Sequence, residues 1–574
     1  MTRLPTRRLA VASVAALAGV LALPLAASAA TTPSAKLSIH TDRNPGWAGT
    51  GQPGLVQIAI EPSASAHRHV VDLYLSTNST VNKRDRHIGS VALSDGESTT
   101  FSYRPGSAPV NPGRFYVLAR IRGTQQTRAA ASEAAGVDPI ARWMSLELNA
   151  VQEIGERGGD DPPYEGTRMM ALVTTSLSDV NAAYAHRTPY APTSRPAAGS
   201  SQLAALHAAG FAILSNQLPS YRSSLRSEYR SAIAALRAGG TGESAIRAGE
   251  AFGRRAAAAI LALRANDNSS YNGPYVPVKP LPYVWEPAAS GPFKGVIAGD
   301  TADKVTPWVI PDVDTVAAGL KGIATPGRDP VGYAAQIEET RTLGALHNTA
   351  VTTIHRTAYD TITGPFWAHD AADTYKPYGH LFNIALWIAA QQHNTLNDNA
   401  RLFGALGAGI ADAATSAWHQ KFAHDQPRPY FVIQSYAATD GIAETIGDPN
   451  WKPLIKPQLG GADGPPFPDY VSGHSTMAGA WGAVMTRFAA QQGWKHTTFR
   501  VGSEEFPQMT RVFDGKVRSS VGYDMNAVDS SYRSMALEDA YSRLPAGVHT
   551  RGATRDGYAM GTVVAGYAIS RFLG

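Results

Sequence analysis

The spacing of apolar residues changes once along this chain, and that change limits the folds that its 574 residues can adopt. In the first part of the chain, apolar residues occur in short strand-like runs separated by Gly, Pro, Asn and Asp. In the much longer remainder they recur at helical spacing. We therefore expect a mainly α protein with a small all-β sandwich domain at 36–123, a linker at 124–137 and an α-helical domain at 138–574.

The β part is defined by runs of β-forming residues at 55–60, 70–75, 87–93, 99–103 and 115–120. Turn-forming residues between these runs are typical of a sandwich of roughly 90 residues. Segments 71–77 and 113–119 resemble the CARDB-type adhesion-like domains of secreted bacterial proteins. A spacer role and a ligand-binding role both remain open for this domain.

Periodic apolar residues in the larger part predict long helices. The segment at 266–330, rich in Pro, Gly and Trp, is too long for an ordinary loop, and we expect it to wrap around the helical body. Asn397 or Asp398 is the expected N-cap of the helix that carries Lys421. We expect helices at 204–237, 245–264, 332–359, 379–392, 398–421 and 558–572.

The first 29 residues have the features of a secretory leader. Three arginines give a positive start, residues 9–25 are apolar, and Ala27-Ser28-Ala29 is a small-residue cleavage site. We therefore predict a secreted, extracellular protein that is cleaved near Ala29. The Arg7-Arg8 pair also allows a twin-arginine route, although its flanking residues match that leader poorly.

Composition excludes several classes of partner and site. Removing the leader takes three of the 51 basic residues and leaves 48 against 46 acidic residues, so we predict no nucleic-acid partner. No later stretch has 18 uninterrupted apolar residues, so we predict no membrane span. The chain has no cysteine, which excludes disulfides, thiolate metal sites and thiol nucleophiles.

One stretch has the pattern of a loop that enters a buried helix. It begins with Pro465-Pro466-Phe467-Pro468, which holds the chain extended, and continues through Ser472-Gly473-His474 into an apolar run. Ser472 or Ser475 is the expected N-cap. Backbone N–H groups are free at a helix N-terminus, and together with the helix dipole they favour an anion.

Two further stretches supply positive charge. Lys421 stands near the end of a predicted helix, and Arg428 follows between two prolines that must stop that helix. Farther along the chain, Arg543 and His549 flank a turn that contains Pro and Gly. Each stretch alone also fits a structural role, such as a lysine at a helix C-terminus. Together they supply the charge neutralisation, the donors and the nitrogen that a tetrahedral oxyanion needs.

Three motifs thus occur in order, Lys421-x6-Arg428-Pro429, Ser472-Gly473-His474 and Ser542-Arg543-x5-His549. In order and spacing they resemble the signature of the type 2 phosphatidic acid phosphatase/vanadium-dependent haloperoxidase superfamily, and in particular secreted bacterial haloperoxidase-like proteins. The resemblance extends from Asp138 to the C-terminus. It implies a helical-bundle catalytic domain behind the β-sandwich.

The resemblance assigns a role to the residues of the three motifs. His549 would be the axial ligand of vanadium in a haloperoxidase, or the nucleophile on phosphorus in a phosphatase. His474 would be the acid–base on the opposite side. Lys421 would also polarise bound peroxide for attack by halide. The oxygens of vanadate or phosphate would be bound by Lys421, Arg428, Ser472, Gly473 and Arg543.

Two aromatic residues favour the haloperoxidase branch. Trp418 and Phe467 stand where fungal chloroperoxidases place aromatic residues near the halide, although core packing would also explain both. This branch implies orthovanadate as the cofactor and hydrogen peroxide and halide as substrates, and it allows a homodimer. The alternatives are an acid phosphatase that acts on phosphate esters through His549 and His474, and an oxyanion-binding protein with little turnover.

Two positions depart from the pattern of the superfamily. Val471 stands where proline is usual, which we expect to alter only the stiffness of the loop. Ala553 stands where many members carry an aspartate that orients the last histidine by a hydrogen bond. Asp556, one turn farther on, is a candidate substitute. A nucleophilic histidine depends on such a carboxylate, so Ala553 weakens the phosphatase alternative more and leaves room for a poor enzyme.

Overall fold

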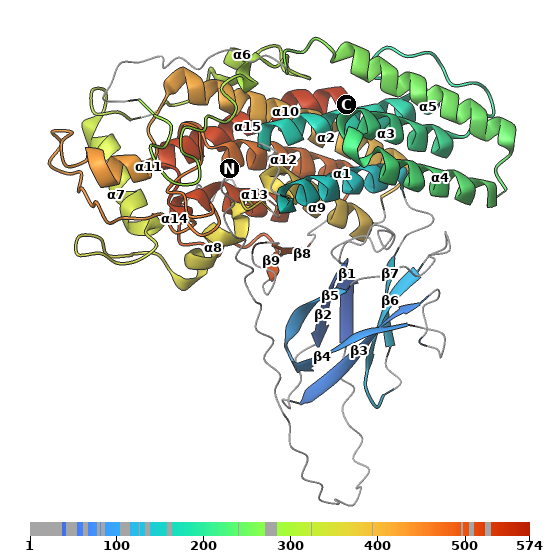
Figure 1. The fold of residues 1–574 in the computed structure, drawn as a ribbon, viewed down its shortest axis with the longest axis horizontal. Helices are drawn as coiled ribbons and strands as arrows, with labels where there is room; N and C mark the ends of the chain where they lie inside the picture. The colour runs from blue at the N-terminus through green and yellow to red at the C-terminus, as the bar shows by residue number, and fades with distance from the viewer. Residues whose placement is uncertain are drawn as a thin grey trace, which may run out of the picture.

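The computed structural model describes the chain from residue 37 to the C-terminus with internal gaps, and the predicted leader at 1–29 lies outside the described residues (Figure 1). Within the described part, no helix combines the length and the hydropathy that a bilayer crossing requires. The described ranges are 37–41, 54–60, 67–76, 81, 86–103, 115–124, 127–132, 138–157, 163–238, 240–269, 284–322, 324–372, 374–392, 394–494, 498–503, 505, 510–522 and 530–574.

The N-terminal part consists of two antiparallel sheets. One has the strand order β1-β2-β5 and the other β4-β3-β6-β7. Alternate side chains from both sheets, such as Ile58, Val71 and Val117, share one hydrophobic core, as a sandwich requires. The strands are β1 (Leu37–Thr41), β2 (Gly54–Ile60), β3 (Arg68–Ser76), β4 (Arg86–Ser94), β5 (Ser98–Tyr103), β6 (Phe115–Ile121) and β7 (Thr127–Ser132).

The sequence did not predict two of these strands. β1 pairs with β2, and β7 pairs with β6 over its whole length. β7 lies inside the segment 124–137 that we expected to be a linker, so that expectation was wrong for residues 127–132. Its three alanines at 129–131 have low β-propensity, and pairing with β6 decides the conformation of the segment.

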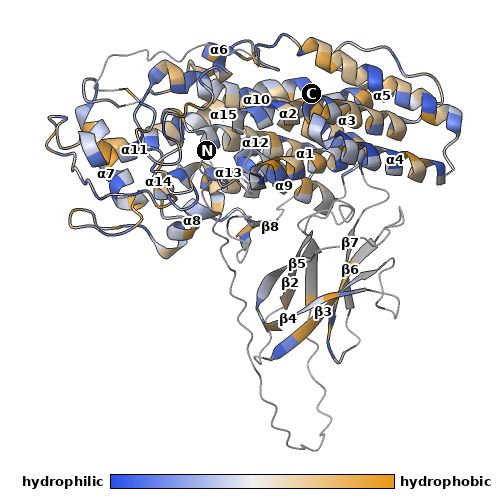
Figure 2. Cartoon of the chain, in the orientation of Figure 1, coloured by the Kyte–Doolittle hydropathy of each residue, from blue (hydrophilic) through white to orange (hydrophobic). Residues whose placement is uncertain are grey.

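The rest of the described chain is mainly helical, with one short hairpin of β8 (Phe499–Gly502) and β9 (Thr510–Phe513). Hydrophobic residues are mixed with hydrophilic ones along the peripheral helices α4 and α5 (Figure 2). The helices are α1 (Pro139–Glu156), α2 (Pro163–Tyr184), α3 (Gln202–Gln217), η2 (Pro219–Tyr221), α4 (Arg222–Ala238), α5 (Glu243–Leu263), η3 (Ala302–Lys304), α6 (Val313–Ala317), α7 (Pro330–Gly344), α8 (Ala358–Ala368), α9 (Lys376–Gln391), α10 (Leu396–His424), α11 (Pro429–Phe431), η4 (Val432–Tyr436), α12 (Gly473–Gln491), α13 (Ser531–Tyr541), α14 (Arg543–Ala546) and α15 (Arg551–Phe572).

Three helix predictions differ from the structure in their bounds. The predicted helix at 204–237 is divided into α3 and α4, because Pro219 follows the end of α3. The predicted helix at 332–359 ends at Gly344, where Ala345 leaves the helix to form a β-bridge with Pro453. The N-cap of α10 is Thr395 in a capping box, not Asn397 or Asp398.

The centre of the helical part is α12, which contacts α10, α13 and α15. Glycines allow α12 and α15 to approach closely. A Cβ on Gly561 would overlap the carbonyl oxygen of Thr476, and one on Gly479 would overlap that of Tyr558. This crossing holds the beginning of α12 against the beginning of α15, where Ser472 N–H donates to the Ala553 carbonyl at 3.0 Å.

We expect Gly561→Ala to lower the free energy of unfolding by about 1–3 kcal/mol, because the added methyl group must separate α12 from α15. Gly566→Ala on the same helix is the matched control, since a Cβ there meets nothing within 4 Å. The control should be neutral or stabilising by up to about 1 kcal/mol. Chemical denaturation measures both. Equal stability of the two variants would contradict the close helix crossing.

Candidate active site

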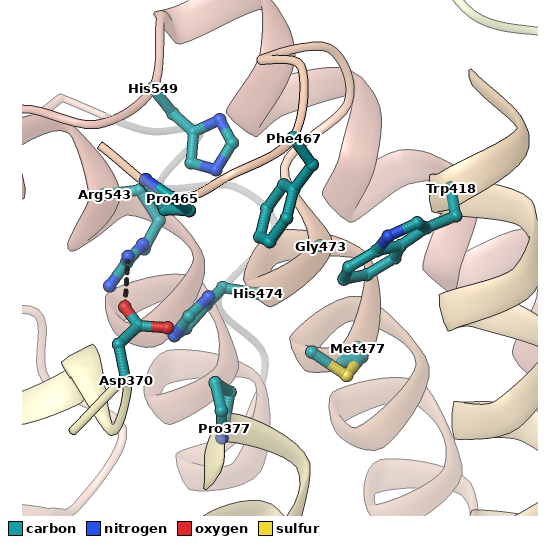
Figure 3. A pocket seen from close by; sticks show the side chains of 10 residues that line it. All are labelled: Asp370, Pro377, Trp418, Pro465, Phe467, Gly473, His474, Met477, Arg543 and His549. Carbon is teal, nitrogen blue, oxygen red and sulfur yellow. Dashed lines mark hydrogen bonds and ion pairs between the residues drawn. The ribbon is translucent and has the colours of Figure 1, made fainter. Parts of the chain in front are cut away.

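Residues of the second and third motifs line one pocket, and Trp418, three residues before Lys421, lines it as well (Figure 3). Its walls come from α10, from the loop before α12, from the first turns of α12, from α14 and the residues after it, and from the segment after α8. Among the predicted site residues, those that line the pocket are Trp418, Phe467, Gly473, His474, Arg543 and His549. Lys421, Arg428 and Ser472 lie behind this lining.

Arg428 is fully buried and is held by two carbonyls. It follows the left-handed C-cap Asp425 of α10 and has an extended backbone before Pro429. Its Nε donates to the Phe467 carbonyl at 2.8 Å and its Nη1 to the Val548 carbonyl at 2.8 Å. Nη1 also lies 3.1 Å from His549 Nε2. Burial lowers the pKa of Arg428 to about 10, so the side chain stays charged at neutral pH.

Arg543 is the second buried guanidinium and lines the pocket directly. Its Nη2 donates to Asp370 Oδ2 at 3.1 Å, the contact drawn in Figure 3. Its Nε and Nη1, together with Nη2 of Arg428, are buried and have no hydrogen-bond partner among the described residues. Unpaired buried donors are costly, and an anion with several acceptor oxygens would satisfy them.

Lys421 is also fully buried, but its ammonium group is already occupied. Nζ donates to the carbonyls of Pro468 at 2.9 Å, Asp469 at 3.2 Å and Val471 at 2.6 Å. Burial, with the nearby charge of Arg428, lowers its pKa well below the usual value. An ammonium has three N–H donors, so Lys421 must release one carbonyl to bind an oxyanion. Its direct contact with an oxyanion stays a prediction.

The Ser472-Gly473-His474 stretch forms the entry to α12 as the sequence predicted. Ser472 is the N-cap, with Oγ accepting from Ser475 N–H at 3.3 Å, whereas Ser475 Oγ donates to the Ala540 carbonyl. A Cβ on Gly473 would lie 3.0 Å from the ring of Trp418, so a larger residue would displace the indole.

His474 points into the pocket beside Asp370 (Figure 3). Its Nε2 donates to the Ala368 carbonyl at 2.8 Å, which leaves Nδ1 as the proton acceptor. Burial and the nearby charge of Arg543 lower the pKa of His474 to about 3. The imidazole is therefore neutral at ordinary pH.

His549 is neutral as well, because burial and then the charges of Arg428 and Lys421 lower its pKa well below the usual value. Its Nδ1 lies 2.5 Å from Oδ1 of the buried Asp469, whose other oxygen, Oδ2, accepts from Thr550 Oγ1 at 2.9 Å. The sequence pattern predicted no role for Asp469 or for Asp370. The only available sign of Asp469 was an acidic residue within an otherwise apolar, proline-rich loop.

Asp556, the candidate substitute for the missing aspartate at 553, is engaged elsewhere. It accepts from Tyr470 Oη and from Gly322 N–H, both at 2.9 Å, and pairs with Arg555. Ala553 is buried in the first turn of α15. The carboxylate that contacts His549 therefore comes from the loop before α12, not from α15.

The two aromatic residues form one wall of the pocket. The rings of Trp418 and Phe467 lie 5.0 Å apart between centroids, and Trp418 Nε1 donates to the Ala298 carbonyl at 3.0 Å. Trp418 also packs into the main core. Both residues thus make structural contacts and line the pocket, and their role toward a halide stays a prediction.

Comparison with known proteins gives consistent matches for this part of the chain. Residues 401–573 match the family model described as the VCPO second helical-bundle domain. Vanadium chloroperoxidase from Curvularia inaequalis is 28% identical over 152 residues, which are 24% of this chain and 24% of that protein. The match thus spans about a quarter of the length of that relative.

Two solved structures share the fold over a longer range. A bacterial vanadium-dependent iodoperoxidase aligns with a TM-score of 0.58 at 18% identity and covers 75% of this chain and 96% of its own. An apo-type bacterial vanadium-dependent chloroperoxidase aligns with a TM-score of 0.50 at 15% identity and covers 72% of this chain and 94% of its own. At these identities the likeness concerns the fold alone.

We expect Lys421→Met to lower the free energy of unfolding by about 1–3 kcal/mol, because three buried carbonyls lose their donor. Lys304→Met is the control, since Lys304 is half exposed and its ammonium group pairs with Asp303. Its effect should stay within about 1 kcal/mol. Denaturation curves compare the variants, and a Lys421→Met protein as stable as the control would contradict the anchoring contacts.

We expect binding of an anion in the pocket to take up protons at pH 5.5. A negative charge near His474 raises its pKa from about 3, so affinity rises as pH falls toward 4. Sulfate is a suitable probe because it stays fully ionised in this range. Calorimetry in two buffers of different ionisation enthalpy measures the uptake.

His474→Ala should reduce the proton uptake, whereas His419→Ala should leave it unchanged, because His419 pairs with Asp303 and Asp314 and does not line the pocket. Sulfate binding without proton uptake by the unmodified protein would contradict the assignment.

Proposed function

We propose that this chain, whose C-terminal helical domain belongs to the type 2 phosphatidic acid phosphatase/vanadium-dependent haloperoxidase superfamily, is a secreted vanadate-dependent haloperoxidase-like enzyme. One observation carries the proposal. Three buried guanidinium nitrogens without partners, on Arg428 and Arg543, lie around the pocket that His549 also lines. This arrangement suits a tetrahedral oxyanion with a nitrogen ligand on its central atom.

Vanadate fits these donors. Arg428 and Arg543 would bind its oxygens, Ser472 and Gly473 at the N-terminus of α12 would add donors, and His549 would supply the nitrogen ligand. Bound vanadate would supply a Lewis acid that activates hydrogen peroxide toward halide.

The neutral histidines have complementary tasks in this proposal. His549 donates through Nδ1 to Asp469, and Nε2 keeps its lone pair for the ligand. His474 donates through Nε2 to the Ala368 carbonyl, so Nδ1 can accept the proton that hydrogen peroxide loses on entering the site. Trp418 and Phe467 exclude water from one side of the pocket.

The test is bromination of a β-diketone by hydrogen peroxide after loading with orthovanadate. We expect activity that phosphate suppresses by competition and that His549→Ala abolishes. His474→Ala should lower the rate by roughly 10²–10⁴-fold, since it removes a proton acceptor. His419→Ala, outside the pocket, is the matched control and should keep its activity. Bromination that survives in His549→Ala would sink the proposal.

A second candidate is a phosphomonoesterase with His549 as nucleophile and His474 as general acid. The contact between Asp469 and His549 favours it, because it supplies the orienting carboxylate that Ala553 lacks. Against it, His474 is neutral in the free site and must gain a proton to act as an acid. Hydrolysis of p-nitrophenyl phosphate without vanadate, inhibited by added vanadate, would identify this activity.

The third alternative, an oxyanion-binding protein with little turnover, drew on Ala553 alone. The carboxylate of Asp469 removes that argument. Anion binding without activity in either assay would restore it.

A further inference from the structure

We propose that Asp469 is the positioning residue of His549, which fixes the tautomer and the orientation of the ring from the loop before α12. The effect of Asp469 on oxyanion binding rests on the proposed function. The contact between Asp469 and His549 does not. It assigns to a residue three positions before Ser472 the task that relatives give to an aspartate four positions after the last histidine.

The hydrogen bonds determine the direction of the proton. An ionised carboxylate only accepts, so the 2.5 Å contact between Asp469 Oδ1 and His549 Nδ1 requires a proton on Nδ1. Arg428 Nη1 lies 3.1 Å from Nε2 and 3.4 Å from Nδ1, so it faces the ring and does not point along the lone pair of either nitrogen. The contact with Asp469 therefore selects the tautomer, with Nδ1 protonated and Nε2 unprotonated.

Asp469 is itself held firmly. Its second oxygen accepts from Thr550 Oγ1, and its backbone N–H donates to the Gln426 carbonyl at 2.9 Å. Lys421 Nζ donates to the Asp469 carbonyl and to those of Pro468 and Val471. Lys421 thus anchors the loop that carries the carboxylate.

The charges around Asp469 support the same role. The carboxyl group is fully buried, and the charges of Arg428 and Lys421 act on it. A carboxylate at this place also offsets part of the mutual repulsion of the two cations. Among the described residues that could replace it, Asp556 is bound to Tyr470, Gly322 and Arg555.

The first experiment needs no oxyanion. The protein is labelled with ¹⁵N at its histidines, and the spectrum of His549→Ala identifies the His549 signals by their loss. We expect the free protein to show His549 protonated on Nδ1 and unprotonated on Nε2. Asp469→Asn should shift His549 toward a mixture of tautomers, whereas Asp556→Asn should not. An unchanged His549 spectrum in Asp469→Asn would overturn the inference.

The second experiment is a double-mutant cycle on orthovanadate affinity, measured by calorimetry. Asp469→Asn should weaken binding roughly 10–100-fold, the usual effect of removing a hydrogen bond behind a ligand. In the His549→Ala background the same change should have no further effect, because Asp469 acts through His549. Equal losses in both backgrounds would show a general disturbance of the loop and would overturn the inference.

The two experiments separate this inference from the proposed function. If the unmodified protein failed to bind orthovanadate, the proposed function would fail, while the tautomer of His549 would still decide the role of Asp469. If orthovanadate bound but Asp469→Asn changed neither the affinity nor the spectrum, the inference would fail alone. Denaturation curves of both Asp→Asn variants verify that each is folded.

Discussion

Three cationic side chains, Lys421, Arg428 and Arg543, are buried around one pocket, and the cost of keeping like charges away from water determines what surrounds them. Backbone carbonyls bind every N–H of the ammonium group and two N–H groups of Arg428. Asp469 and Asp370 add negative charge. Three guanidinium nitrogens have no hydrogen-bond partner among the described residues, and an oxyanion would accept hydrogen bonds from them.

The helices make this arrangement possible by bringing distant segments together. α10 ends in the left-handed residue Asp425, which turns the chain so that Arg428 reaches the pocket. The glycine-mediated crossing of α12 and α15 sets Ser472 against the beginning of α15, next to His549 and Thr550. The loop before α12 connects the end of α10 to the beginning of α15. Lys421 and Arg428 bind this loop on one side, and Thr550 binds it on the other.

The sequence was sufficient for the features that depend on local pattern or on motif order. Helical periodicity predicted the mainly α domain, alternating runs predicted the β-sandwich, and three spaced motifs predicted the likeness to haloperoxidases that residues 401–573 show. The sequence was insufficient where a residue distant in the chain decides the local conformation or the contact. β7 forms because β6 is beside it, α7 ends because Ala345 pairs with Pro453, and Asp469 contacts a histidine 80 positions away.

Ala553 is a second position at which a local pattern was insufficient. A gap-free alignment of the motif predicted a histidine without its carboxylate, because it compared only neighbouring positions. The structure supplies a carboxylate from another loop, at Nδ1 of the ring. A hydrogen bond to a functional histidine can thus be retained while a different residue makes it.

The most direct test of the account is X-ray absorption at the vanadium edge of the protein loaded with orthovanadate. The account predicts the outer-shell scattering of an imidazole ring bound to vanadium, and its loss in His549→Ala. A spectrum of the unmodified protein without imidazole scattering would contradict it.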